Sequence, residues 1–145
     1  MSRCDYRYFG DVMSFDSMYR TNAYNRSLVI FIEVNHHMKT VIFRFGLLVN
    51  KMVDTYRWIS QKFLKAMHGK SLITVVTDGD KAMSKAIRLV LPSTVQHLCC
   101  WHLERNVQMN VCDIGFTQAF THCMLTYMTE AEFESHWLNV IERFG

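Results

Sequence analysis

The strongest constraint on the fold is the order in which two hydrophobic periodicities follow each other along the chain. Residues 12–16, 28–32 and 41–45 are short stretches rich in β-branched and aromatic side chains, which is typical of strands. The intervening residues 35–39 predict a hairpin turn. From residue 54 apolar side chains recur every three or four positions, as they do on one face of a helix. The pattern therefore predicts three successive strands and then a helix.

The next part of the chain alternates strands with helices. Residues 72–77 predict a fourth strand that ends at Asp78, and residues 83–91 return to helical spacing. Residues 94–99 predict a fifth strand, which runs into a helix from about His102. Three consecutive strands followed by two helical crossovers build a mixed five-stranded sheet flanked by helices. This is an α/β fold with the strand order of ribonuclease H-like nucleases.

The C-terminal part of the sequence predicts helices only. An apolar stripe runs from Phe116 to Tyr127, and Thr129 and Glu132 have the spacing of a capping box at the start of a last helix. We expect that last helix to carry its apolar residues on one face, namely Phe133, Trp137, Ile141 and Phe144.

Composition limits the class of protein without choosing a function. The 145 residues are half hydrophobic, which suffices for one core, and 16 Lys and Arg against 13 Asp and Glu give a net charge of +3. That charge permits DNA contact without requiring it. Five cysteines with no expected secretory segment favour a reducing compartment over a disulfide framework. The longest apolar stretch, residues 28–34, is far shorter than the ~18–20 residues that cross a bilayer, so no membrane partner is expected.

Asp16 and Asp78 are the first candidates for chemistry. They are 62 positions apart in sequence, but the first and fourth strands of such a sheet are neighbours. Carboxylates suit Mg²⁺, and two ions ~3.5–4 Å apart cleave phosphodiesters, normally with a third carboxylate as ligand. In the alternative interpretation both acids are turn residues and Asp80 caps the helix that begins at Lys81. Spacing alone does not decide between the two.

The second candidate cluster is Cys99-Cys100-Trp101-His102. Cys99 and His102 lie three positions apart where a strand meets a helix, but tetrahedral zinc needs four ligands. No other paired cysteine or histidine spacing is present to complete a site. The simpler interpretation is that Cys99 is a small buried hydrophobic residue and His102 a hydrogen-bonded residue at a helix start.

These two clusters and their surroundings resemble the Mutator-like element (MULE) transposase domain. The version they most resemble is the plant far-red impaired response (far-red elongated hypocotyl) family of domesticated transposases. The matching positions follow the family order and cover essentially the whole chain: residues 8–24, 34–37, Trp58, 77–83, 98–102 and 132–137. Each segment alone is a weak signal, whereas the combination is specific.

The resemblance implies a division of the chain and a set of site residues. Residues 1–112 would form the ribonuclease H-like core, and residues 113–145 the start of a helical insertion. Asp16 and Asp78 match the first two catalytic carboxylates of the family, which would bind Mg²⁺ or Mn²⁺. The family places its third acid beyond the insertion, so this chain is expected to lack it and the catalytic pair to be vestigial.

The resemblance also assigns a motif and points to departures from the family pattern. Cys99, Trp101 and His102 match the C-x-x-H signature. Where the family usually has an Asp-Glu pair before the first helix, this chain has Asn50 and Lys51, which reverses a charge. Such a change is compatible with release from catalysis.

The function implied by the resemblance is that of a nuclear, transposase-derived protein related to light-signalling transcription regulators and inactive as an enzyme. The expected partners are DNA and full-length family members, in a homodimer or heterodimer. The family's zinc-finger and SWIM domains are not expected in this chain, so zinc belongs to full-length relatives. Two alternatives stay open: a metal-dependent DNA strand transferase that takes its third acid from a longer product, and a truncated interaction module.

Overall fold

The computed structural model describes residues 6, 11–18, 23–35 and 37–145. The chain forms two compact units, Met1–Leu98 and Cys99–Gly145. Among the described residues, the first unit contains the sheet together with helices α2 and α3, and the second contains helices only. The division at residues 112 and 113, which came from the family resemblance, stays a prediction.

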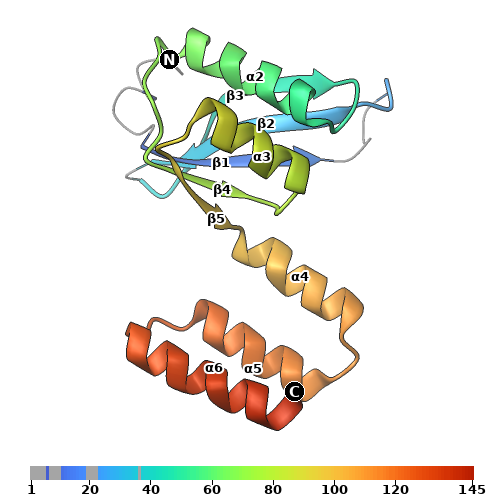
Figure 1. The fold of residues 1–145 in the computed structure, drawn as a ribbon, viewed down its shortest axis with the longest axis vertical. Helices are drawn as coiled ribbons and strands as arrows, with labels where there is room; N and C mark the ends of the chain where they lie inside the picture. Colours follow the sequence, from blue (N-terminus) through green and yellow to red (C-terminus); the bar gives the residue numbers. More distant parts are fainter. Residues whose placement is uncertain (1–5, 7–10, 19–22, 36) are drawn as a thin grey trace. The chain divides into compact units, whose positions relative to one another are not determined.

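The first unit is built on a five-stranded sheet in the order β3-β2-β1-β4-β5 (Figure 1). The strands are β1 (Val12–Met18), β2 (Ser27–Val34), β3 (Thr40–Leu48), β4 (Thr74–Thr77) and β5 (Val95–Leu98). β1 pairs antiparallel with β2, as β2 does with β3, whereas β4 is parallel to both β1 and β5. The mixed sheet with the ribonuclease H-like strand order is therefore confirmed.

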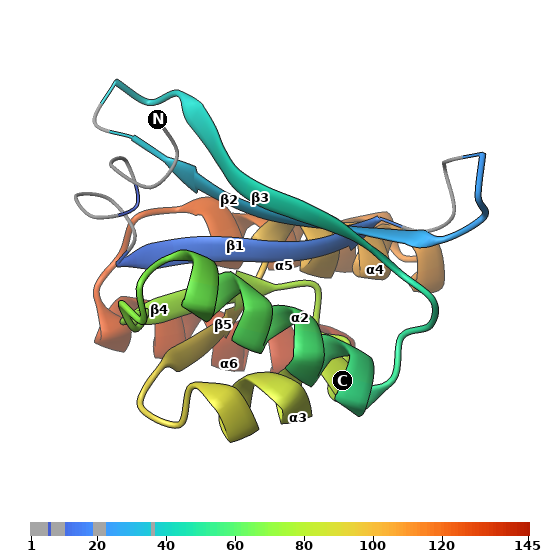
Figure 2. The same ribbon diagram turned by 90° about the horizontal axis from the view of Figure 1, so that it is seen from above.

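Two helices, α2 (Val53–Ala66) and α3 (Lys81–Val90), lie on the same face of this sheet and pack against each other (Figures 1 and 2). The buried side chains of α2 recur at helical spacing, as the sequence predicts. The helix ends where His68 and Gly69 adopt positive φ angles of 57° and 75°. Gly69 takes this left-handed conformation without the steric cost that a Cβ atom imposes.

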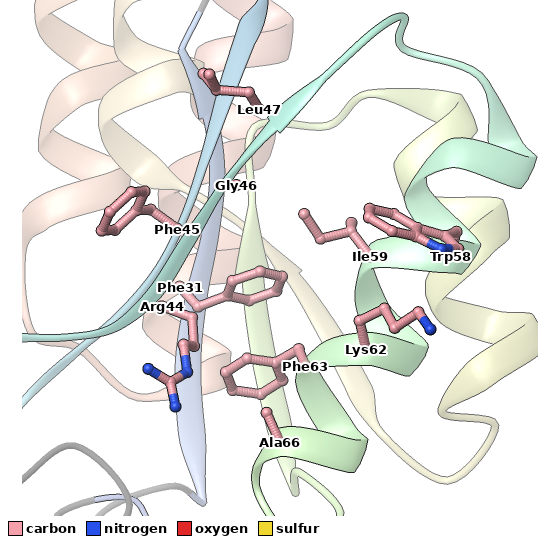
Figure 3. Close-up of a pocket in the computed structure, with 10 residues that line it drawn as sticks. All are labelled: Phe31, Arg44, Phe45, Gly46, Leu47, Trp58, Ile59, Lys62, Phe63 and Ala66. Atoms are coloured by element: carbon pink, nitrogen blue, oxygen red, sulfur yellow. The ribbon is translucent and has the colours of Figure 1, made fainter.

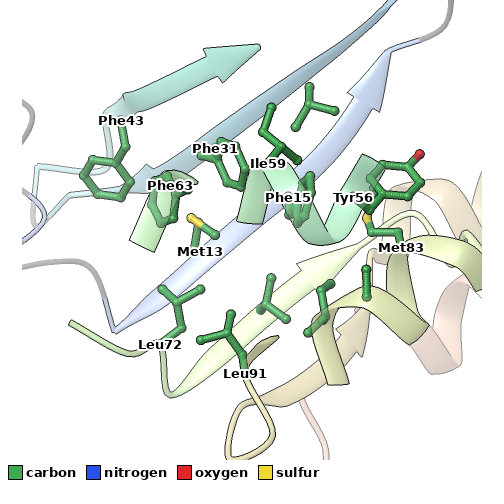
Figure 4. Packing of buried hydrophobic residues seen from close by; sticks show 14 of the residues in the cluster. Met13, Phe15, Phe31, Phe43, Tyr56, Ile59, Phe63, Leu72, Met83 and Leu91 are labelled. Atoms are coloured by element: carbon green, nitrogen blue, oxygen red, sulfur yellow. The ribbon is translucent and has the colours of Figure 1, made fainter. Parts of the chain in front are cut away.

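Aromatic rings fill the space between the sheet and α2 (Figure 4). Phe31 stacks on Phe63 with ring centroids 4.3 Å apart, and Phe15 lies 4.6 Å from Phe31. Tyr6 packs edge-on against Phe43 and Phe63. Burying each large ring stabilises the fold by about 1.5–3 kcal/mol relative to leaving it in water. This cluster therefore fixes the position of α2 on the sheet.

Some element boundaries differ from the sequence predictions. β1 continues two residues past Asp16, because Asp16 still pairs with Ile30 and the ladder to β2 extends to the pair Met18 and Leu28. Asp16 is therefore inside a strand, whereas we expected it at or just past the strand end. β4 begins at Thr74, two residues later than predicted, and β5 is shorter than predicted by one residue at each end.

The second unit consists of α4 (Cys100–Asn110), α5 (Ile114–Leu125) and α6 (Glu130–Phe144). The predicted capping box is confirmed: Thr129 N–H donates to Glu132 Oε2 over 2.7 Å, and Glu132 N–H donates to Thr129 Oγ1 over 3.4 Å. Rings join α5 to α6, as the Phe120 and Trp137 centroids lie 6.1 Å apart. Among the described residues no helix has the length and apolar character needed to span a membrane.

Candidate acidic site on β1 and β4

Strand register places the two predicted acids in neighbouring positions. The parallel β1–β4 ladder ends with Phe15 opposite Thr77. Asp16 and Asp78 each follow directly on these partners, one within β1 and the other just past β4. The structure thus brings them to adjacent strands, as the strand order predicts. Their role as metal ligands stays a prediction.

Ser17 connects Asp78, one of these two acids, to α2 and to the residue Lys51 that precedes it. It is buried, and successive side chains of a strand point to opposite faces, so it lies on the other face from Asp16. Its hydroxyl donates to Asp78 Oδ2 over 3.2 Å. The same oxygen accepts from Lys51 Nζ over 2.8 Å and from the Tyr56 hydroxyl over 3.3 Å. A serine hydroxyl has one donor and two acceptor positions, so these three bonds use it completely.

The second oxygen of Asp78 holds the turn that starts α3. Asp78 Oδ1 accepts the Asp80 N–H over 3.0 Å, across Gly79 with its φ of 87°. Asp80 Oδ1 then accepts the N–H groups of Ala82 and Met83 over 2.8 and 2.9 Å. The prediction that Asp80 caps α3 is confirmed, and Asp78 does act as a turn residue. The same interpretation is wrong for Asp16, which is in a strand.

Tyr56 is a buried residue of α2 whose hydroxyl contacts Ser17. Burial raises the pKa of its phenol to about 12; the hydrogen bond with Ser17 opposes the shift, and the charges of Asp80 and Asp78 add to it. The phenol is therefore protonated at neutral pH and donates to Ser17 Oγ.

The residues that the structure describes do not by themselves complete a two-metal centre. In the part of the chain that the structure describes, no group of three or more His, Cys, Asp or Glu side chains could hold a metal ion. Both carboxylate oxygens of Asp78 accept hydrogen bonds from the protein itself. The charged group held against Ser17, the hydrogen-bond partner of Asp78, is the Lys51 ammonium, which repels cations.

The C-x-x-H segment lies at the start of α4. Cys99 is the half-buried N-cap residue, and its side chain makes no capping hydrogen bond. The Trp101 and His102 rings meet edge-on with centroids 4.8 Å apart, and the Arg105 guanidinium lies 5.3 Å from the centre of the Trp101 ring. In this first part of α4, the exposed Trp101 ring therefore packs against both the His102 ring and the Arg105 guanidinium. The absence of a metal cluster among the described residues applies to this segment too.

Sequence reasoning missed the network around Ser17. It noted Lys51 only as a reversed charge and did not connect it with Ser17, which is 34 positions earlier in the chain. The alternation along β1 was the available signal, since it turns Ser17 towards the helix that follows Lys51.

A separate groove lies between β3 and α2 (Figure 3). Ile59 and Phe63 turn from α2 towards the strand, while Trp58 is half exposed beside them. At Gly46 the strand approaches the helix so closely that an added Cβ would clash with Ile59 Cδ1. The groove is thus an apolar slot whose closest approach depends on a glycine.

A mixed sheet in this order, with acids on adjacent central strands, defines a core of the ribonuclease H-like class. The family model described as the MULE transposase domain matches residues 12–106. The chain belongs to this transposase family, as its motifs predict.

Two relatives from Arabidopsis thaliana are similar to the chain over nearly all of its length. The chain is 37% identical to Protein FAR1-RELATED SEQUENCE 4 over 145 residues, covering 97% of this chain and 20% of the relative. It is 30% identical to Protein FAR-RED IMPAIRED RESPONSE 1 over 149 residues, covering 99% of this chain and 18% of that relative. The chain therefore spans about a fifth of the length of these relatives.

Among solved structures, the chain is similar to the catalytic core domain of BIV integrase. The TM-score is 0.41 with 6% sequence identity, over 93% of this chain and 99% of that one. A likeness at this level is loose, and nothing about function follows from it.

Proposed function

We propose that this protein is a transposase-derived nuclear regulator that binds DNA through its sheet-containing unit and does not cleave it. Membership in the MULE transposase domain family supports a relation to DNA. The name of one Arabidopsis relative, Protein FAR-RED IMPAIRED RESPONSE 1, refers to a far-red response, so the proposal includes a role in light-dependent gene regulation.

The observation that carries the proposal is an uneven distribution of charge between the two units. Residues 1–98 contain 14 Lys and Arg and seven Asp and Glu, whereas residues 99–145 contain two and six. The net charges are therefore +7 and −4, a contrast hidden by the overall value of +3. A basic domain attracts the phosphate backbone, which supplies most of the non-specific affinity of DNA-binding proteins.

Part of this charge lies on the outer faces of α2 and α3. Lys81, Lys85 and Arg88 of α3 are exposed, and their spacing of four and three residues places them on one side of the helix. The neighbouring α2 exposes three further cations: Arg57, Lys62 and Lys65. Since both helices cover the same face of the sheet, we assign this basic face, made of the six residues, to contact with phosphates.

The DNA-binding part of the proposal is tested by titrating duplex DNA at several salt concentrations. We expect the logarithm of the affinity to fall steeply with the logarithm of salt concentration, because bound phosphates release counterions. Replacing Lys81, Lys85 and Arg88 together by Gln should reduce the slope by up to about three units. Arg105→Gln with Arg143→Gln, the matched control in the acidic unit, should leave the slope unchanged. Equal slopes for all three proteins would contradict the assigned surface.

The catalytic part rests on the absence of a three-ligand cluster among the described residues and on the engaged carboxylate of Asp78. Its test is nicking of supercoiled plasmid in Mn²⁺, with the wild-type protein and Asp78→Asn compared. We expect no cleavage by either protein. Cleavage by the wild-type protein that Asp78→Asn abolishes would favour the alternative, a metal-dependent strand transferase.

The interaction-module alternative has one supporting observation. The described residues of the helical unit expose several large apolar side chains, and the predicted stripe on α6 is divided: Phe133 and Ile141 are exposed, whereas Trp137 and Phe144 are half-buried. Such a surface suits pairing with another family member. Sedimentation of the chain at increasing concentration tests this, and a monomer throughout would count against pairing with itself.

A further inference from the structure

The start of α2 fixes the position of Lys51. Asn50 Oδ1 accepts the Met52 N–H over 3.3 Å and the Thr55 hydroxyl over 2.5 Å. Met52, the N-cap residue, is extended, with φ of −94° and ψ of 157°. These constraints fix the backbone on both sides of Lys51, so only its side chain has to be ordered for the ammonium to reach β1.

The ammonium of Lys51 is bound to one residue of β1 by two hydrogen bonds. Nζ donates to the Ser17 carbonyl oxygen over 3.3 Å and to Ser17 Oγ over 2.8 Å. Ser17 Oγ then donates to Asp78 Oδ2 over 3.2 Å. A single hydroxyl therefore separates a cation from the strand-end carboxylate.

Burial strengthens the electrostatic interaction between Lys51 and Asp78 through Ser17. Ser17 and Tyr56 are buried, and Lys51 and Asp78 are half-buried, so water screens their charges less than at an open surface. The Tyr56 hydroxyl takes the remaining acceptor position of Ser17, which leaves the serine proton directed at Asp78. The three side chains thus hold Ser17 in a single hydrogen-bonding arrangement.

From this geometry we infer that Lys51 is a built-in cation that compensates Asp78 and thereby excludes a divalent metal ion from this carboxylate. A metal ion binding to Oδ2 would have to break the bond from Ser17 and lie close to the ammonium, and both steps weaken its binding. The inference rests on the proposed function and deepens it, since it gives a physical reason why this carboxylate would not support metal-dependent cleavage. Its test measures metal binding, which does not depend on DNA.

The experiment is a titration of the full chain with Mn²⁺, followed by electron paramagnetic resonance of the free ion. The proteins are the wild type, Lys51→Met, Lys51→Glu and Lys39→Met, an exposed lysine in the β2–β3 turn that serves as the charge-matched control. Because a nearby positive charge is removed, we expect Lys51→Met to bind Mn²⁺ roughly 10–100-fold more tightly than the wild type, and Lys51→Glu at least as tightly as Lys51→Met. Lys39→Met should behave as the wild type.

Adding Asp78→Asn to each Lys51 variant shows whether the increase in Mn²⁺ affinity arises at the Asp78 carboxylate. We expect the tighter binding to disappear in both double variants. Equal Mn²⁺ affinity in the wild type and Lys51→Met, or no Asp78-dependent binding in either Lys51 variant, would overturn the inference. DNA titrations of the same proteins keep the outcomes separate, because absent or salt-insensitive wild-type binding would contradict the proposed DNA contact without changing the Mn²⁺ result.

Discussion

Asp80 is the residue on which the start of α3 depends. Its carboxylate accepts two backbone N–H groups that would otherwise have no partner within the helix. We predict that Asp80→Ala lowers the free energy of unfolding by about 1 kcal/mol, within the 0.5–2 kcal/mol range of N-cap losses. Urea unfolding followed by circular dichroism measures this. Asp80→Asn keeps the acceptor and should recover most of the loss; equal losses in the two variants would show that capping is not the cause.

Glu33 makes stability depend on pH. Burial raises the pKa of its carboxyl from 4.5 to about 7, with the charge of Asp11 adding to the shift and that of Lys70 opposing it. Among the described residues its Oε2 atom has no hydrogen-bond partner. Because the folded state holds this proton more tightly than the unfolded chain, stability is lost as the pH rises from about 4.5 to about 7.

We therefore predict that Glu33→Gln raises the melting temperature at about pH 8 and leaves it nearly unchanged at about pH 4, where the glutamate is mostly protonated in both states. Thermal unfolding of the two proteins across this pH range is the measurement. Parallel pH profiles would show that Glu33 is not responsible for the dependence.

At the level of elements, the contact between β3 and α2 depends on a missing side chain. A Cβ atom at Gly46 would clash with Cδ1 of Ile59. We predict that Gly46→Ala destabilises the protein by about 1 kcal/mol, at the low end of the usual cost of overpacking, because the clashing atom is the end of a side chain. Ile59→Val removes the clashing atom and should itself cost about 0.5–1.5 kcal/mol. The combined variant should therefore be more stable than the sum of the single losses implies, and strict additivity would refute the clash.

The elements themselves were largely predictable from sequence, whereas their contacts were not. The change from alternating to helical spacing near residue 54 and the Thr129–Glu132 spacing are local signals, and both features are present in the structure. The true end of β1 depends on pairing with Leu28 in another strand, which no local pattern records. The bonds from Lys51 and Tyr56 to Ser17 likewise arise only when α2 docks on the sheet.

The site shows the same limit. The neighbouring positions of Asp16 and Asp78 follow from strand order alone, and the cap by Asp80 follows from its place before a helix. The engagement of Asp78 by Ser17 needs the side-chain directions at the end of β4, which spacing does not give. The basic face was readable in principle from the spacing of Lys81, Lys85 and Arg88.

At the scale of the whole molecule, the two units have net charges of opposite sign and therefore differ in their electrostatic interaction with a polyanion such as DNA. A net charge of +7 favours electrostatic contact of the first unit with DNA, and a net charge of −4 disfavours such contact of the second. A partner for the helical unit would accordingly be selected by its exposed apolar side chains rather than by phosphate contacts.

This contrast predicts where DNA protects the chain. Hydrogen exchange of the full chain, with and without duplex DNA at low salt, should show slower exchange in residues 53–90, where α2 and α3 carry the basic face, and no change in residues 114–144 of the acidic unit. Raising the salt concentration should remove the protection, because phosphate contacts weaken as counterions compete. Protection confined to α5 and α6 would instead place the DNA contact on the acidic unit. It would contradict the proposal that the difference in net charge determines where DNA binds.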